Sequence, residues 1–204
     1  IVASPDMTAR ARAKLPSANI ASAQVRHGDI APLDGSAGAA DLIIGNNVLA
    51  QVPDLNSFVA GVALALAADG TATFEFPHLM TLLDQNQFDT IYHEHFWYFS
   101  LLSAERLFAS HGLTLFDVEE LWTHGGSLRV YLRPAADESR AVSQRVLDLR
   151  AREEAAGYRN IATYERFEEQ VRSTKRKLLA LLMDAKNQGK KIVGYGAPGK
   201  GNTL

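Results

Sequence analysis

The chain has 204 residues, 47% hydrophobic and 22% charged, which is the composition of a globular protein with a packed core. Its 21 basic and 23 acidic side chains give a net charge of −2, so the sequence disfavours non-specific binding to nucleic acid or to an anionic membrane. It contains no cysteine, which excludes disulfides, thiolate zinc sites and cysteine nucleophiles within this stretch.

Both ends of the sequence suggest a piece of a longer protein. The first residue is Ile1, and the last four residues follow a glycine-rich turn with no helix to complete it. The opening residues lack the pattern of a signal peptide, and no apolar run reaches the roughly 18 residues of a membrane span. We therefore interpret the chain as an internal part of a cytoplasmic protein with no membrane partner.

The first half of the chain alternates helical and extended patterns. Residues 4–14 predict a helix, and residues 25–29 and 41–45 predict short buried strands. A second helix, capped by Asp54, is expected to run through residue 68 before a strand over residues 71–76. This β-α-β-α-β order is typical of a parallel sheet flanked by helices.

The next part predicts a helix and an antiparallel pair of strands. The helix covers residues 103–111 and ends at Gly112. Residues 113–119 and 127–132 predict strands joined by a turn at Gly125 and Gly126, and we expect them to pair at an edge of the sheet.

The last part predicts two charged helices and a final strand. The helices cover residues 137–157 and 164–188, and the apolar residues 178–183 predict a buried end for the second one. Residues 190–194 predict a strand that enters a glycine-rich loop, so a second α/β unit would begin where the chain ends.

Polar residues follow three of the predicted strands. Ligands of open parallel sheets bind beyond the carboxyl ends of the strands. Asp29 suits an adenine amino group or a ribose hydroxyl, and Asn46 and Asn47 can both donate and accept hydrogen bonds. Glu75 and His78 follow the third strand. For each of them the alternative is a local role in capping a turn.

The sequence Tyr92-His93-Glu94-His95 is the densest group of reactive side chains. It predicts a proton-transfer site in which His95 or His93 removes a proton, Glu94 orients the base, and Tyr92 donates to a developing oxyanion. Zinc is disfavoured because histidines two residues apart do not share a helix face. One structural histidine beside an exposed one is the remaining alternative.

A glycine-rich loop covers residues 194–201, Gly-Tyr-Gly-Ala-Pro-Gly-Lys-Gly. It fits the pattern Gly-x-Gly-x-x-Gly but misses the nucleotide-binding P-loop, because Gly201 stands where serine or threonine should hold magnesium. Its glycines allow backbone N–H groups to approach a phosphate, with Lys200 nearby. An NAD(P)-dependent oxidoreductase that uses Gly194 to Gly199 is therefore an alternative.

Taken in order, these segments resemble the sugar C-methyltransferases, S-adenosylmethionine-dependent enzymes that methylate a nucleotide-linked keto-deoxysugar. The resemblance runs nearly end to end, and its most specific parts are the Tyr-His-Glu-His block and the Gly-Tyr-Gly-Ala block. It is carried by residues 46–49 with 52–54, 74–78, 88–96 with 98–100, 123–129, and 194–197 with 200–203.

The resemblance implies an α/β fold with a class I methyltransferase, Rossmann-like sheet that is parallel except for an antiparallel edge hairpin. Residues 1–134 would form the C-terminal part of the methyltransferase domain, residues 135–189 a helical connector, and residues 190–204 the start of a second α/β domain that helps to hold the substrate. The family's N-terminal zinc-binding domain and first cofactor loop would precede the chain, so no metal ligand is expected within it.

The resemblance also implies roles for individual residues. His95 would remove the C-3 proton beside a C-4 ketone, Tyr92 would donate to the enolate, and Glu94 would orient His95 or balance its charge. S-adenosylmethionine would lie near Asp29, Asn46 and Asn47. The nucleotide-linked sugar would contact Glu75, His78, His124, Tyr195, Lys200 and Asn202.

Two departures from the family pattern keep a catalytically degenerate scaffold as a further alternative. The acidic residue that holds the cofactor ribose is absent at Val2 and Ala3. Gln51 stands where the family has a histidine near the sugar.

Overall fold

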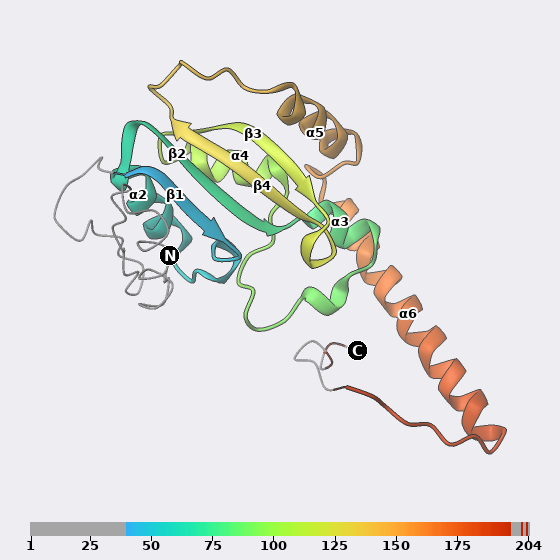
Figure 1. Ribbon diagram of the computed structural model, residues 1–204. Coiled ribbons are helices and arrows are strands. Elements are labelled where there is room, and N and C mark those ends of the chain that lie inside the picture. The colour runs from blue at the N-terminus through green and yellow to red at the C-terminus, as the bar shows by residue number, and fades with distance from the viewer. Residues whose placement is uncertain (1–39, 197–200, 202, 204) are drawn as a thin grey trace, which may run out of the picture.

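A computed structural model describes residues 40–196, 201 and 203 of the chain. In this part a four-stranded mixed sheet has the strand order β1-β2-β4-β3, and α2 and α4 lie behind it in the view of Figure 1. The predicted helix over residues 4–14 and the predicted strand over residues 25–29 lie outside the described residues.

The sheet combines one parallel pair with an antiparallel hairpin. Strand β1 (Ala40–Asn46) pairs in parallel with β2 (Leu66–Pro77). Strand β4 (Ser127–Pro134) runs antiparallel to β2 and to the edge strand β3 (Leu113–Leu121). The predicted parallel pair and edge hairpin are thus confirmed. The ends of β1 and β2 and the β3–β4 turn consequently share one edge, which we call the carboxyl edge.

Helix α2 (Leu55–Ala65) begins where the sequence predicts. The Asp54 carboxylate accepts a hydrogen bond from the Ser57 N–H at 3.0 Å. The predicted end at residue 68 is wrong, because the backbone becomes extended at Leu66 and strand β2 starts there, opposite Ala40. Pairing with β1 therefore overrides the helical pattern of this leucine- and alanine-rich stretch.

The core lies between the sheet and the helices. Phe74 of β2 contacts Phe58 of α2 edge-on and stacks on Phe108 of α4 (Leu101–Ala109) at 5.8 Å between ring centroids. Val146 and Leu149 of α5 (Gln144–Ala155) belong to the same core. Each such side chain stabilises the fold by about 1.5–3 kcal/mol relative to its exposed state. The predicted domain boundary at residue 134 stays a prediction. Helix α5, which follows that residue, shares the core of the sheet.

Short helical turns connect these elements. The 3₁₀ turn η1 (Leu49–Gln51) follows β1, and α3 (Leu79–Asp84) follows β2. The turn η2 (Phe88–Thr90) precedes the Tyr-His-Glu-His block, and η3 (Thr123–Gly125) forms the β3–β4 turn.

In three stretches the structure differs from the predicted burial or the predicted strand. Leu42 and Ile44 of β1 are exposed, since alternate side chains of this strand point away from the core. Helix α6 (Ile161–Asn187) projects away from the sheet (Figure 1), so its predicted buried end is wrong and Leu181 is 65% exposed. The predicted strand over residues 190–194 is also wrong, because this stretch pairs with no strand of the described residues. No helix in the described ranges is both long and apolar enough to span a bilayer.

Replacing Gly126 with alanine should lower the melting temperature of the full-length protein more than replacing Gly112. Both glycines have positive φ, +119° and +73°, and alanine there is strained by about 1–3 kcal/mol. At Gly126 the added Cβ would also lie 2.5 Å from the Thr81 methyl carbon, whereas nothing lies within 4 Å at Gly112. Calorimetry of both variants checks this, and equal shifts would contradict the steric part of the argument.

Candidate active site

At the carboxyl edge, Asn47 and His124 come together from the two sides of β2. Asn47 follows β1 with a left-handed backbone, φ 54°, and its N–H donates to the carbonyl oxygen of Glu75 at 2.8 Å. Its side-chain Nδ2 lies 3.3 Å from Nε2 of His124, which is also left-handed at φ 53°. The residue before Asn47 in the chain, Asn46, is exposed at the end of β1.

Glu75 lies beneath this edge and not on its surface. Glu75 is 5% exposed, and its two oxygens accept hydrogen bonds from the Thr123 hydroxyl at 2.9 Å and from Arg129 Nη2 at 2.8 Å. The bond to Glu75 raises the pKa of the Arg129 guanidinium above its usual value. Both oxygens are therefore engaged inside the domain, and the predicted contact of Glu75 with the substrate stays a prediction.

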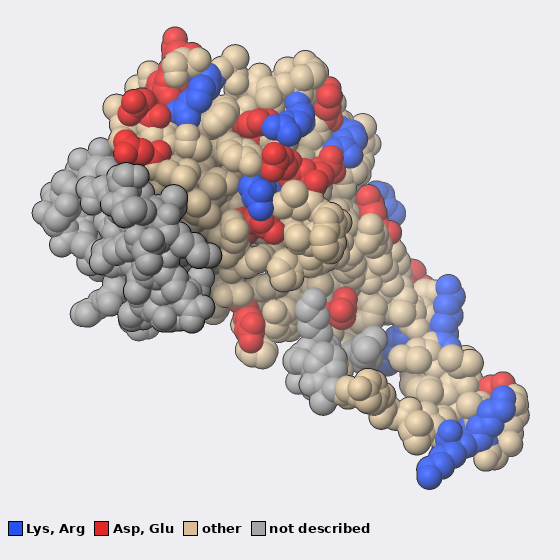
Figure 2. Space-filling model, viewed as in Figure 1, with Lys and Arg blue, Asp and Glu red and all other residues tan. Residues whose placement is uncertain are grey.

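Acidic and basic side chains alternate beyond Glu75 on the front face of the sheet (Figure 2). Arg129 is 3.5 Å from Glu119 of β3 as well as 2.8 Å from Glu75. Arg145 of α5 pairs with Asp117 of the same strand. This row of charges connects the carboxyl edge to α5.

The segment after Tyr92 is fixed to the turn that follows β1. The N–H groups of Phe96 and Trp97 donate to the carbonyl oxygen of Ala50 at 2.8 and 3.2 Å. The Trp97 indole N–H donates to the carbonyl oxygen of Val52 at 2.7 Å. Because Ala50 belongs to η1, directly after β1, these bonds hold the Tyr-His-Glu-His block near the carboxyl edge.

Within the block, the rings of Tyr92 and His95 lie next to each other, with 4.7 Å between centroids. The Tyr92 hydroxyl donates to the Glu94 carboxylate at 3.4 Å. Partial burial, and then the charge of Glu94, raise the pKa of the Tyr92 phenol above its usual value. The phenol is therefore protonated at neutral pH and can donate a hydrogen bond.

The position of the hydrogen on His95 follows from its neighbour. Nδ1 lies 3.2 Å from the backbone carbonyl oxygen of Thr90, which can only accept. A neutral His95 ring that donates from Nδ1 carries its lone pair on Nε2, the nitrogen that can take up a proton. The block therefore combines a base, a phenol donor and a carboxylate.

Comparisons with known proteins agree with this geometry. Residues 3–118 match the family described as "Methyltransferase domain", and residues 122–204 match "C-methyltransferase C-terminal domain". The chain belongs to the methyltransferase family. Its described sheet joins a parallel pair of strands to the antiparallel hairpin expected from the sequence.

Individual relatives are also similar to this methyltransferase. C-methyltransferase NovU of Streptomyces niveus is 41% identical over 167 residues, which are 82% of this chain and 40% of NovU, so the chain spans two fifths of that relative. The solved PH0226 protein of Pyrococcus horikoshii OT3 is 17% identical, with a TM-score of 0.45 over 64% of this chain and 68% of that one. A putative methyltransferase in complex with the Haloferax volcanii Trm112 activator is 16% identical, with a TM-score of 0.47 over 64% and 69%.

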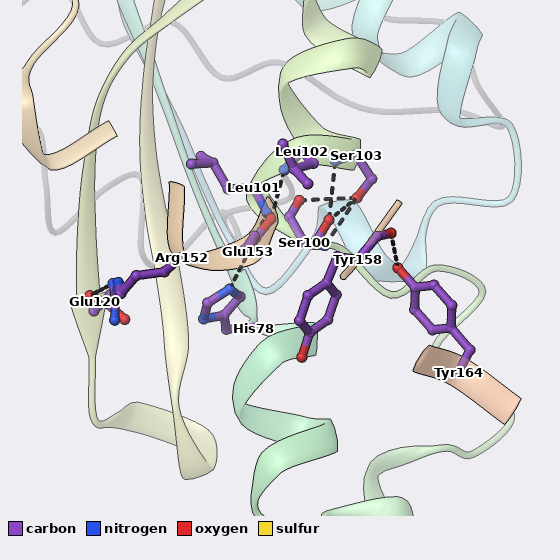
Figure 3. A network of polar contacts seen from close by, with 10 residues as sticks. All are labelled: His78, Ser100, Leu101, Leu102, Ser103, Glu120, Arg152, Glu153, Tyr158 and Tyr164. Atoms are coloured by element: carbon purple, nitrogen blue, oxygen red, sulfur yellow. Dashed lines mark hydrogen bonds and ion pairs between the residues drawn. The ribbon is translucent and has the colours of Figure 1, made fainter. Parts of the chain in front are cut away.

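His78 of this methyltransferase directly follows β2, and its backbone N–H donates to the carbonyl oxygen of Gly126 at 3.0 Å, but its ring points into the domain toward Glu153 (Figure 3). Its ring is 2% exposed, and Nε2 donates to the buried Glu153 carboxylate at 2.8 Å. The same carboxylate accepts from the N–H groups of Leu101 and Leu102, the first residues of α4, at 2.7 and 2.9 Å. The ring therefore has a structural contact inside the domain, and the predicted contact of His78 with the substrate stays a prediction.

The remaining predicted site residues divide by position. Tyr195 is fully exposed on the segment after α6, and Asp29, Lys200 and Asn202 lie outside the described residues. The described ranges contain no group of three or more histidine, aspartate or glutamate side chains that could hold a metal ion.

Three residues were not expected from the sequence: Thr90 and Arg129, which contact His95 and Glu75, and Glu153, which holds His78 inside the domain. Thr90 acts through its backbone, which carries no sequence signal. Arg129 could have been found from the strand register, since it stands directly opposite Glu75 in the β2–β4 pair.

Proposed function

We propose that the full-length protein transfers a methyl group from S-adenosylmethionine to C-3 of a nucleotide-linked 4-keto-deoxysugar. The observation that carries this proposal is the Nδ1 hydrogen bond of His95 to Thr90, which provides a base at Nε2 beside the Tyr92 phenol. The similarity to a C-methyltransferase at 41% identity supports methylation at carbon.

The residues fit what methylation at carbon requires. A C–H group is a poor nucleophile, and the C-3 proton becomes acidic because the adjacent C-4 ketone can accept the charge. His95 Nε2 takes this proton, and the Tyr92 hydroxyl donates to the resulting enolate oxygen. The hydroxyl has a single hydrogen, which it donates to Glu94 at 3.4 Å in the structure and would redirect to the enolate oxygen during the reaction.

The cofactor supplies an electrophilic methyl group on a sulfonium. Asn46 is exposed at the end of β1 and Asn47 lies on the same edge, so their amides fit the polar groups of the methyl donor. C-3 of the enolate would then form the new carbon–carbon bond while the bond from the methyl group to sulfur would break. His124, with Tyr195, Lys200 and Asn202, would contact the sugar nucleotide. We expect this reaction in the cytoplasm, without a nucleic acid or membrane partner.

The alternative of an NAD(P)-dependent oxidoreductase is weakened because the strand expected before its glycine motif is not found. A dinucleotide-binding glycine motif follows a strand, and residues 190–194 form none in the described part of the chain.

The test is product analysis with the full-length protein. Incubation with S-adenosylmethionine and a panel of nucleotide-linked 4-keto sugars should give one product that has gained one methyl group by mass spectrometry. Carbon NMR should place that group on C-3. Methylation at oxygen or nitrogen would contradict the proposal, and no methylation of any sugar would support the degenerate scaffold.

A further inference from the structure

We propose that Glu75 is a positioning residue that holds Asn47 and His124 together across the carboxyl edge and so orients His124 toward the sugar substrate. The orientation toward the sugar rests on the proposed function. The contacts of Glu75 with Asn47 and with Thr123 are seen in the structure and do not depend on the proposed function.

Glu75 reaches both partners of the pair. Its backbone carbonyl accepts from the Asn47 N–H at 2.8 Å, and its carboxylate accepts from the hydroxyl of Thr123, the residue before His124, at 2.9 Å. The second carboxylate oxygen is engaged by Arg129 at 2.8 Å, which compensates the buried charge. One residue of β2 therefore fixes the loop after β1 and the β3–β4 turn.

The backbone at this point needs such support. Asn47 and His124 are two of the three non-glycine residues with positive φ in the described ranges, and Gly125 and Gly126 continue the turn at 83° and 119°. Left-handed residues persist where surrounding contacts over-determine them, and they gather at functional sites.

The pair has a spectroscopic signature. The Asn47 amide Nδ2 is a donor, so the facing Nε2 of His124 accepts and the ring hydrogen is on Nδ1. This tautomer is visible in long-range ¹H–¹⁵N correlation spectra of the full-length protein labelled at histidine, with His124→Asn to assign the signal. The folding of the domain alone does not require a hydrogen on Nδ1 of this ring.

Glu75→Ala and Thr123→Val should both shift His124 away from the Nδ1–H form. Thr123→Val has nearly the same shape and leaves the Glu75–Arg129 pair in place, so it tests the proposal even if Glu75→Ala fails to fold. Glu119→Gln is the matched control, because it removes the other carboxylate near Arg129 and keeps Glu75. Its His124 signal should resemble that of the unchanged protein.

The kinetic test uses the sugar found by product analysis. Thr123→Val should raise KM for that sugar by up to about tenfold, the value of one hydrogen bond, with a smaller change in kcat. Retention of the Nδ1–H form in Thr123→Val, or its equal loss in Glu119→Gln, would overturn the positioning role. A shifted tautomer with unchanged KM would overturn the link to the substrate. Because the spectra need no turnover, failure of the methyl-transfer proposal remains distinguishable.

Discussion

Replacing His95 with asparagine in the full-length protein should slow methyl transfer by about 10²–10⁴-fold, the usual contribution of a positioned acid–base group. Asparagine can keep the hydrogen bond to the Thr90 carbonyl, because its amide nitrogen lies near the place of Nδ1. It has no basic nitrogen at the place of Nε2. The variant therefore separates the base from the contact that holds it.

Exchange of the C-3 proton with heavy water gives a second measurement. In the presence of the demethylated cofactor product, the unchanged protein should wash deuterium into C-3, and His95→Asn should lose this exchange together with turnover. If methyl transfer is slow while exchange stays at its normal rate, His95 is not the base.

The neighbouring histidine is the matched control. His93 is exposed and its ring lies edge-on to Tyr92 at 5.8 Å, so His93→Asn makes the same chemical change two residues away. It should keep nearly the full rate. A large loss in His93→Asn with a small one in His95→Asn would transfer the role to His93, which the residue pattern alone left open.

Local patterns predicted the elements whose signals lie within a few residues. The cap at Asp54 and the hairpin whose strands are joined at Gly125 and Gly126 are confirmed, since capping and turn chemistry act over short distances. The end of α2 could not be predicted this way, because it depends on the pairing of Leu66 with Ala40. The exposed apolar residues of α6 have the spacing of a buried face and were mistaken for one.

In the candidate site, too, the features set by neighbouring residues could be predicted, and the contacts between distant residues could not. Tyr92, Glu94 and His95 are contiguous, so their chemistry is visible in the sequence. The Asn47–His124 contact spans 77 residues, and the His78–Glu153 contact spans 75. Such contacts are set by the strand order and the placement of α5, which no local pattern carries. His78 was therefore assigned to the substrate, although its partner lies inside the domain.

Replacing Glu153 with alanine should lower the free energy of unfolding of the domain by about 3–5 kcal/mol, because a buried donor that loses its acceptor costs about 1–3 kcal/mol and Glu153 accepts from several. Glu153 is 0% exposed and accepts from His78 Nε2 and from the N–H groups of Leu101 and Leu102. Alanine leaves two buried donors and one partly buried donor without their acceptor. It also removes the carboxylate that the positive end of the α4 dipole stabilises.

Hydrogen exchange of the full-length protein locates this effect. In Glu153→Ala the amides of Leu101 and Leu102 should lose protection, and calorimetry should show the lower melting temperature. Glu154→Ala is the control on the same helix: this residue is 46% exposed in its side chain and pairs with Arg159 at the surface, so its removal should change the stability by less than about 1 kcal/mol. If the two variants lose similar stability, then the buried carboxylate does not join α4 to α5, and the first turn of α4 is held by the capping box of Ser100 and Ser103 instead.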